Sequence, residues 1–177
     1  MAGIVDWFLT WWLRSGRYPW SKLRRKLFEA GYLKTELPTV ASLGDIESCL
    51  KTVTWTMDGP LHLFDSISYP QTVWKRKKDD CDGFAVLACE LLDRLNPSCA
   101  PALVTVMVRP VKKSHSVCVF TAEEGGLSVF DNGRLKTGFT GYPEVIAMLT
   151  EKAERLICWD ARKHDTFELL EFSSGVY

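Results

Sequence analysis

Two hydrophobic periodicities divide the chain near residue 100. Before that point apolar residues recur every three or four positions, the period of an amphipathic helix. After it they alternate, which is typical of strands. The first pattern predicts helices over residues 4–12, 20–30, 43–53 and 81–95. The second predicts strands over 102–108, 116–121 and 127–130, then a helix over 143–155 and strands over 156–160 and 166–172. Helices followed by antiparallel strands indicate an α+β fold.

Glycine and proline mark where several elements end. The breaking residues are Gly16, Pro19, Gly31 and the Asn96-Pro97 pair. The glycine-bearing segment 122–126 predicts a hairpin turn. Residues 56–70 show neither period and are expected to form a long loop closed by Pro70, followed by a short turn over 71–78.

The composition is that of one soluble globular domain. The chain has 177 residues, 46% hydrophobic and 25% charged, which is enough for one core and too few for two. We expect a helical N-terminal extension over 1–40, a core over 43–135 and a C-terminal helix with strands over 136–177. Lys plus Arg equals Asp plus Glu at 22 each, so no global charge indicates a nucleic-acid partner. The six cysteines form no CxxC pair, which favours a reducing, cytoplasmic location.

The first 34 residues combine tryptophan with basic side chains. Seven basic residues stand against Asp6 and Glu29, a net charge of +5. A secretion signal is not expected, because Asp6 interrupts the apolar run and no basic region precedes it; about ten apolar residues are also too few to span a bilayer. Residues 1–30 therefore either make a peripheral membrane contact or bind an acidic partner, or pack their apolar sides on the domain and roof an active-site groove.

Cys81 stands at the first turn of the predicted 81–95 helix. Asp79 and Asp80 precede it in capping position. Backbone N–H groups and the positive end of the helix dipole lower the pKa of a thiol placed there. Cys81 shares a helical face with Phe84 and Ala85, so we expect it to point toward the sheet. The alternative is that Cys81 is an ordinary core residue.

A nucleophilic cysteine needs a base, and the base needs an orienting group. His115 begins one predicted strand and Asp131 ends the next, so a three-residue turn brings both side chains to one face, opposite or diagonal to each other. We expect this face to carry the valine stripe over 104–108 and to be covered by the Cys81 helix. The pattern predicts a Cys81–His115–Asp131 triad, against the alternative of a structural histidine and a turn aspartate.

Four segments carry a resemblance. DDCDGFAVLACELL presents a cysteine and an acidic residue at a helix start, HSVCVF and FDNGRL present a histidine and an aspartate on strands, and YPQTVWKRKKDDC leads into the cysteine. Together they resemble the transglutaminase-like superfamily, in particular its bacterial transglutaminase-like cysteine proteinases, over about residues 43–135. The resemblance implies a papain-like core in which the helix bearing Cys81 packs on an antiparallel sheet bearing His115 and Asp131.

The same resemblance implies a thiol hydrolase that cleaves peptide or amide bonds of a protein or peptide substrate through a thioester. Two other functions stay open. A transglutaminase or deamidase uses the same triad and differs in the nucleophile that reaches the thioester. A protein that keeps the fold without activity would be a scaffold or interaction protein.

Two carboxylates, Asp80 and Asp82, flank the thiol and raise its pKa. The His115 imidazolium, the basic run 75–78 or a bound cation would offset them. The resemblance implies Ca²⁺ as an optional cofactor at Asp80 and Asp82, because some similar proteinases depend on calcium through acidic groups there. Further ligands would come from backbone carbonyls, from water or from another acid of the 56–70 loop, such as Asp58 or Asp65. The alternative is that Asp80 caps the helix and Asp82 is a first-turn charge, with no cofactor required.

An oxyanion formed at the substrate needs hydrogen-bond donors. The backbone N–H of Cys81 is one candidate, and the side chain of Gln71 or Trp74 is the second. Trp74 also fits a core or groove-wall position. His62 and His164 have no partner at metal-ligand spacing, so we expect both to be structural or exposed.

Overall fold

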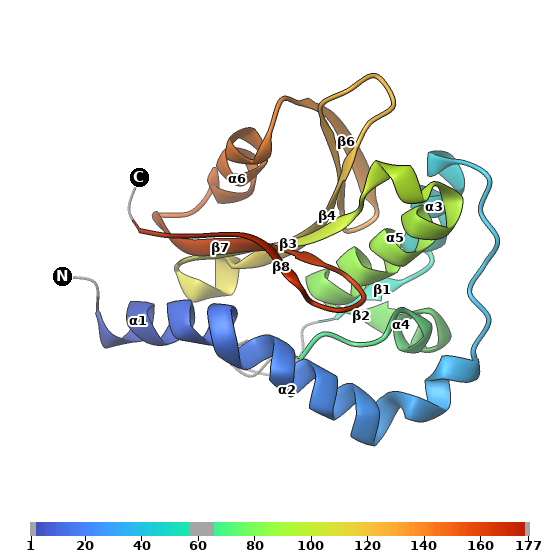
Figure 1. Ribbon diagram of the computed structural model, residues 1–177, viewed down its shortest axis with the longest axis horizontal. Helices are drawn as coiled ribbons and strands as arrows, with labels where there is room; N and C mark the ends of the chain where they lie inside the picture. Colours follow the sequence, from blue (N-terminus) through green and yellow to red (C-terminus); the bar gives the residue numbers. More distant parts are fainter. Residues whose placement is uncertain (1–2, 57–65, 176–177) are drawn as a thin grey trace.

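The structure is a computed structural model that describes residues 3–56 and 66–175. Its α-helices are α1 Ile4–Trp11, α2 Arg17–Arg24, α3 Leu43–Lys51, α4 Pro70–Arg76, α5 Cys81–Leu95 and α6 Tyr142–Thr150. The π-helical turns are η1 Trp12–Gly16 and η2 Arg25–Glu29, and the 3-10 turns are η3 Ala30–Lys34, η4 Pro97–Cys99 and η5 Val111–Lys113. The elements from α1 to η3 follow one another directly and form a long N-terminal rod (Figure 1).

The described residues contain two sheets. Their strands are β1 Thr54–Trp55, β2 Lys78–Asp79, β3 Ala102–Arg109, β4 His115–Thr121, β5 Leu127–Asp131, β6 Arg134–Phe139, β7 Arg155–Lys163 and β8 Leu169–Ser174. The large sheet has six strands in the order β6-β5-β4-β3-β7-β8, and each neighbouring pair is antiparallel. β1 and β2 form a separate parallel pair. The predicted α+β class is confirmed.

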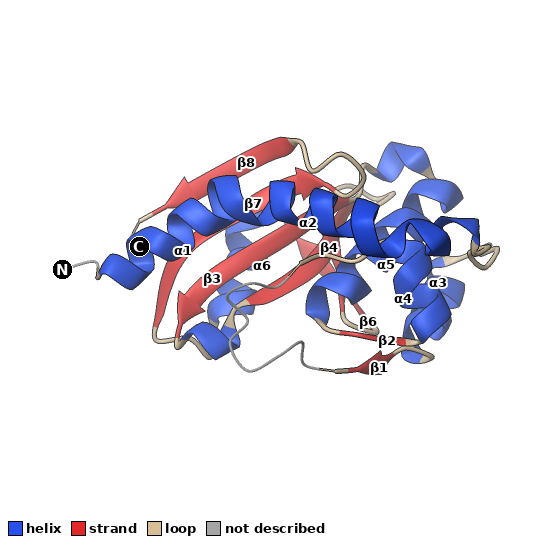
Figure 2. Ribbon diagram, turned by 90° about the horizontal axis from the view of Figure 1, so that it is seen from below, coloured by secondary structure: helices blue, strands red, loops and turns tan. Residues whose placement is uncertain are grey.

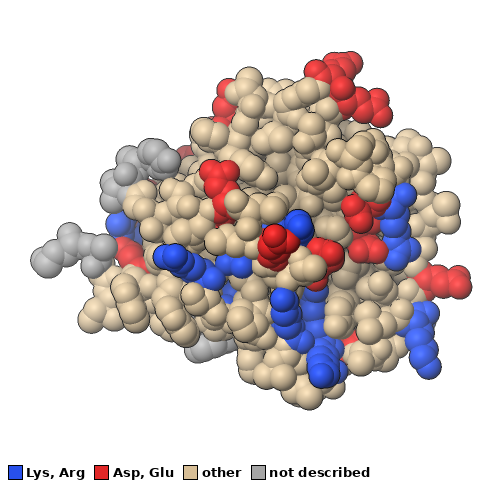
Figure 3. All heavy atoms as spheres, in the orientation of Figure 1, with Lys and Arg blue, Asp and Glu red and all other residues tan. Residues whose placement is uncertain are grey.

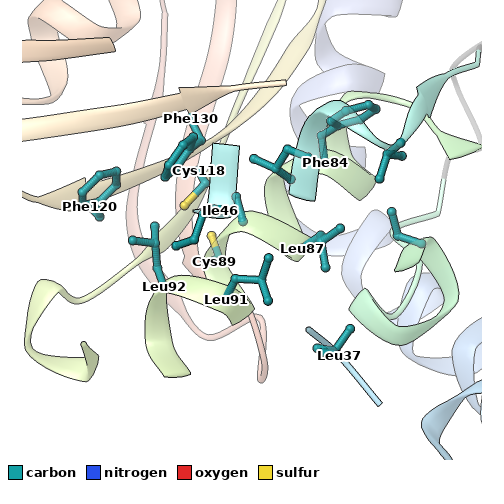
Figure 4. Close-up of a cluster of buried hydrophobic side chains, with 14 of the residues drawn as sticks. Leu37, Ile46, Phe84, Leu87, Cys89, Leu91, Leu92, Cys118, Phe120 and Phe130 are labelled. Carbon is teal, nitrogen blue, oxygen red and sulfur yellow. The ribbon is translucent and has the colours of Figure 1, made fainter. Parts of the chain in front are cut away.

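Helices cover both faces of the large sheet, α6 on one side and α5 with the N-terminal rod on the other (Figures 1 and 2). The core beneath α6 contains the valines of β3, β4 and β5. The core beneath α5 contains Cys118, Phe120 and Phe130 of the sheet, packed on residues such as Cys89 and Leu92 (Figure 4). The expectation that α5 covers the valine stripe is therefore wrong. Both faces of β3 and β4 are apolar. Strand parity therefore assigns residues to one face or the other, but it does not predict which helix packs on each face.

Neither Gly16 nor Pro19 breaks the N-terminal rod, contrary to expectation. Pro19 lacks an N–H and normally interrupts a helix, but the wide turn η1 precedes it and accommodates the change. In the same turn, the carbonyl of Arg14 accepts a hydrogen bond from Nη2 of Arg162 at 3.0 Å. Gly16 is required by packing, because a Cβ atom there would lie 2.5 Å from Cε3 of Trp12.

The second half of the rod presents its apolar residues to solvent. Trp20, Leu23, Leu27 and Phe28 are exposed. Its buried residues are Arg17, Tyr18, Ser21, Arg25 and Glu29. The interpretation in which these apolar sides pack on the domain is thus wrong here, and Gly31 lies inside η3 rather than ending the rod. Within residues 3–56 and 66–175, no helix has both the length and the apolar character needed to cross a bilayer.

The C-terminal segment is part of the sheet, not an addition to it. β7 lies beside β3 in the interior of the sheet, and β6, which the periodicity did not predict, forms one edge. α6 ends at Thr150, five residues before the predicted end. Before α5, residues 70–76 form helix α4 with Pro70 in its first turn, where the periodicity predicted a turn and the resemblance of the segment leading to Cys81 implied a short helix. Most of the predicted 56–70 loop lies outside the described residues.

Candidate functional site

Cys81 is the first residue of α5, as predicted. Asp80 is the N-cap: its Oδ1 accepts from the N–H of Asp82 at 3.1 Å, and its carbonyl accepts from the N–H of Phe84 at 3.2 Å. Gly83 allows the preceding strand to approach, because a Cβ atom there would lie 2.3 Å from Cγ of Asp79. The half-buried thiol of Cys81 therefore stands at a well-formed helix N-terminus.

His115 and Asp131 meet, as the strand parity predicted. The register pairs Cys118 with Phe130, so Val117 lies opposite Asp131 and His115 is diagonal to it. Nε2 of His115 lies 2.7 Å from Oδ1 of Asp131. The hydrogen bond from His115 holds the pKa of Asp131 well below its usual range, and Lys136 adds to the effect with Nζ 2.7 Å from Oδ2. Since an ionised carboxylate only accepts, Nε2 carries the proton and leaves Nδ1 of a neutral ring as a base.

Cys81 and His115 line one small cavity of about 30 Å³. Its other walls come from the N-terminal rod (Leu9, Trp12, Arg17), from β3 (Thr105, Met107) and from residues 111–116 around the start of β4. A cavity of this size has room for about two water molecules. The rod thus covers the site, as one of the interpretations of residues 1–30 proposed.

His115 also lines a second, larger cavity of about 360 Å³ on its other side. Asp131 and Lys136 lie in its wall, with Lys113, Lys152 and the apolar side chains of Met148 and Leu149. His115 therefore lines both a narrow space that Cys81 also lines and a wider space whose wall contains three lysines, Asp131 and Glu151. The wider space has the size of a binding pocket for one or two side chains.

Arg17 is a member of the site that sequence reasoning did not find. It is 3% exposed, its Nη2 pairs with Oδ2 of Asp82, and its Nη1 donates to Oγ1 of Thr105 at 3.1 Å. That hydroxyl lies 3.0 Å from Oγ of Ser116, next to His115. A buried guanidinium thus offsets the carboxylate that follows Cys81, a role expected of His115, the 75–78 run or a cation. The pair is separated by 65 residues, which is why no local pattern indicated it.

Three acidic residues could hold a cation near the thiol. Oxygens of Asp79, Asp80 and Asp82 all lie within 4.8 Å of one another, and all three residues are buried. Oδ1 of Asp82 is buried with no hydrogen-bond donor among the described residues. However, Asp82 already pairs with Arg17, and calcium takes six to eight oxygens. The further ligands considered, Asp58 and Asp65, lie outside the described residues, so the donor set that the structure shows does not fit calcium by itself.

Gln71 and Trp74 were the candidates for the second oxyanion donor. Neither Gln71 nor Trp74 lines the cavity that Cys81 shares with His115. Trp74 packs against the core beneath α5, and Nζ of Lys77 lies 2.6 Å from the centre of its ring. Buried side-chain oxygens usually accept a hydrogen bond. Oε1 of Gln71 is buried and accepts none from the described residues.

The cysteines and the histidine described next lie outside the candidate site. Burial raises the pKa of Cys158 to about 12 and raises that of Cys118 as well. His164 is buried, 3.5 Å from Oε2 of Glu90, which fits the predicted structural role. His62 lies outside the described residues.

No protein-family model and no curated protein matches this chain. The likeness to transglutaminase-like proteins is therefore one of the motifs around Cys81, His115 and Asp131.

Proposed function

We propose that the protein is a thiol hydrolase that cleaves peptide or amide bonds through Cys81, His115 and Asp131. One observation carries the proposal: His115 contacts Asp131 through Nε2 at 2.7 Å and lines a common cavity with Cys81 at the start of α5. Base, orienting carboxylate and a thiol at a helix N-terminus are the three parts that cysteine catalysis requires.

The chemistry follows from these roles. Nδ1 of His115 removes the thiol proton, and the Cys81 sulfur forms a bond to the substrate carbonyl carbon. When the tetrahedral intermediate collapses, the C–N bond breaks, the imidazolium protonates the departing amine, and a thioester remains. Water, losing its proton to His115, then attacks the thioester and releases the acid and the Cys81 thiol. The N–H of Cys81 at the helix start is one donor for the oxyanion.

Asp131 fixes the ring and stabilises its charge. Its carboxylate accepts the Nε2 proton of His115 and favours the imidazolium that forms when the thiol ionises. Lys136 adds to the lowering of the Asp131 pKa by His115 through its contact with Oδ2. Arg17 offsets the charge of Asp82 beside the sulfur, so we propose that no bound cation is required.

The proposal includes a distant relationship to transglutaminase-like proteins with a papain-like core. The segments that carry the resemblance form α5, β4 and β5, the elements that hold the three side chains. All six cysteines are reduced thiols, in keeping with a reducing compartment, and we place the enzyme in the cytoplasm.

Digestion of a mixed peptide library by the full-length chain, followed by mass spectrometry, tests the proposal. Cys81→Ala should abolish cleavage, while the matched variant Cys49→Ala, at the other half-buried thiol, should keep it. Asp131→Asn should reduce the rate on the order of 10⁴-fold with the fold intact, by analogy with other triads. Cleavage that survives Cys81→Ala would refute the proposal.

A labelled alkylamine in the same reaction separates hydrolysis from amine transfer. Incorporation of the label into glutamine-containing peptides without cleavage assigns the chain to the transglutaminase alternative. A chain that neither cleaves nor incorporates amine, and whose Cys81 reacts no faster than Cys49 with a thiol probe, is the interaction protein of the third alternative.

A further inference from the structure

The N-terminal rod, residues 4–34, is attached to the domain by apolar contacts of Leu9, Trp12 and Leu13 in its first half and by polar contacts in its second half. The inner row of the second half consists of buried polar residues four positions apart: Arg17, Ser21, Arg25 and Glu29. Oγ of Ser21 accepts from the N–H of Ile67 at 3.1 Å, and Nε of Arg25 donates to the Ile67 carbonyl at 2.7 Å. Glu29 accepts from the N–H of Tyr69 at 2.8 Å and from the Thr72 hydroxyl at 2.9 Å. The inner side of the rod's second half is therefore occupied by hydrogen bonds to the domain.

Both acidic residues of the rod are buried and form ion pairs. Asp6 is 4% exposed and forms ion pairs with Arg109, at 2.8 Å, and with Arg155. Glu29 is 0% exposed and also pairs with Arg24 at 2.6 Å. No acidic side chain of residues 4–34 is left on the surface.

The outer side of the rod is apolar. Nine of the twelve large hydrophobic side chains that are exposed among the described residues belong to it. The most exposed are Ile4 at 87%, Phe28 at 71%, Trp7 at 68% and Leu27 at 63%. An apolar surface that large on a soluble domain usually marks an interaction site.

Every exposed charge on the rod is positive. Arg14, Lys22, Lys26 and Lys34 are exposed, and Arg24 is partly so. Figure 3 shows basic side chains along the lower edge of the molecule, over α2. The sequence carries a net charge of +5 in this segment, and burial of Asp6 and Glu29 leaves its surface with basic groups alone.

We propose that the outer side of the rod binds the surface of an anionic phospholipid bilayer. Tryptophan, phenylalanine and leucine on one side of a helix, bordered by lysine and arginine, have the composition of a helix that lies in the membrane interface. The rod lies flat, with its apolar side chains among the lipid acyl chains and its basic side chains at the anionic headgroups. The proposal does not depend on the thiol chemistry.

The charge pattern favours a bilayer over a second copy of the chain. Two rods facing each other would bring like charges together, because each presents only basic groups. A bilayer with anionic lipid supplies the opposite charge along the whole length of the rod. It also needs no acidic groove of matching shape.

Co-sedimentation of the full-length chain with vesicles tests the proposal. Vesicles of phosphatidylcholine and phosphatidylserine in a two-to-one ratio should pellet the protein, while vesicles of phosphatidylcholine alone should pellet much less, and high salt should weaken binding. Leu27→Gln with Phe28→Ser should reduce affinity on the order of tenfold or more. Lys22→Gln with Lys26→Gln should reduce it on the order of twentyfold, about fivefold for each charge.

The matched control is Leu169→Gln with Leu170→Gln, two exposed leucines on β8 outside the rod. This variant should bind like the wild type, and circular dichroism should show that all variants are folded. Failure of the wild type to pellet with anionic vesicles would overturn the proposal, as would equal losses in the control. A dimer in sedimentation velocity that Leu27→Gln with Phe28→Ser dissociates, together with no vesicle binding, would assign the surface to a second copy instead.

Discussion

Helix α5 and the second half of the N-terminal rod are held on the domain by opposite chemistry. The buried side of α5 is apolar, with Leu87, Leu91 and Leu92 in the core. The buried side of the rod's second half is polar, and its apolar side is exposed. Hydrophobic periodicity shows that a helix has two sides; it does not show which side is buried. The usual assumption that the apolar side is buried holds for α5 and for the first half of the rod, where Leu9 and Leu13 are buried, and fails for its second half.

The two attachments differ in what they tolerate. Hydrophobic contacts are non-directional, so a core position accepts side chains of similar volume. Arg17 donates a hydrogen bond to Oγ1 of Thr105 and Arg25 donates one to the Ile67 carbonyl. Each bond requires a guanidinium group in one position and orientation. Substitutions of Arg17 and Arg25 should therefore lower the free energy of unfolding more than is usual for charged residues of an amphipathic helix.

The largest expected effect comes from Arg17→Met. This change leaves the Asp82 carboxylate buried without its ion pair, and loss of one partner of such a pair costs about 3–5 kcal/mol. The double variant Arg17→Met with Asp82→Leu should recover much of the loss, because it removes both charges. Urea unfolding measures both. A single variant as stable as the wild type would show that the rod is not attached through this pair.

Equal leucine-to-alanine substitutions compare the two regions directly. Leu91→Ala in α5 should lower the free energy of unfolding by about 2–5 kcal/mol through a cavity in the core. Leu27→Ala on the rod should change it by no more than about 0.5 kcal/mol, since that side chain is in water. Equal losses at the two positions would mean that Leu27 is buried in solution and that the rod has the opposite orientation.

A smaller effect concerns acid. Burial disfavours the charged form of Asp6, but hydrogen bonds from Arg155 and Arg109 lower its pKa below the usual value overall. Its contribution to stability is therefore present above the unfolded-state pKa of about 3.9 and is lost as pH falls through the lower folded-state pKa. Asp6→Asn should destabilise at neutral pH and flatten the acid limb of the stability curve. A parallel offset between variant and wild type at all pH values would contradict this assignment.

The smallest expected effect is that of calcium. Because Arg17 already offsets Asp82, added Ca²⁺ should leave the melting temperature unchanged and chelator should leave activity unchanged. A bound ion would instead stabilise the fold by about 2.7 kcal/mol at a hundredfold excess over its dissociation constant. Differential scanning calorimetry with and without Ca²⁺ distinguishes these results.

Local signals predicted much of the fold. The bounds of α5 were predicted from period, cap and Asn96-Pro97, and the hairpin of β4 and β5 from alternation around a glycine turn. β6 was missed because its residues are mostly polar, as is common on an edge strand. The central position of β7 was missed because long-range strand order leaves no local pattern.

In the candidate site, too, contacts within one hairpin were predicted and contacts from other segments were missed. His115 and Asp131 lie in one hairpin, so their contact followed from strand parity and register. Arg17 and Lys136 were missed. Arg17 reaches Asp82 from the rod, and Lys136 lies on the strand that was not predicted. Charged partners from distant segments depend on tertiary packing, which periodicity does not describe.

The measurement that tests the central claim most directly is the alkylation rate of each cysteine by limiting iodoacetamide at neutral pH, followed by peptide mapping. Cys81 should react fastest of the six thiols, because it lies at a helix N-terminus in the cavity that His115 lines. His115→Ala should remove this advantage. Cys49 is the internal reference, since it is also half-buried and burial raises its pKa. Preferential labelling of Cys49 or Cys158, or a Cys81 rate that His115→Ala leaves unchanged, would contradict the triad.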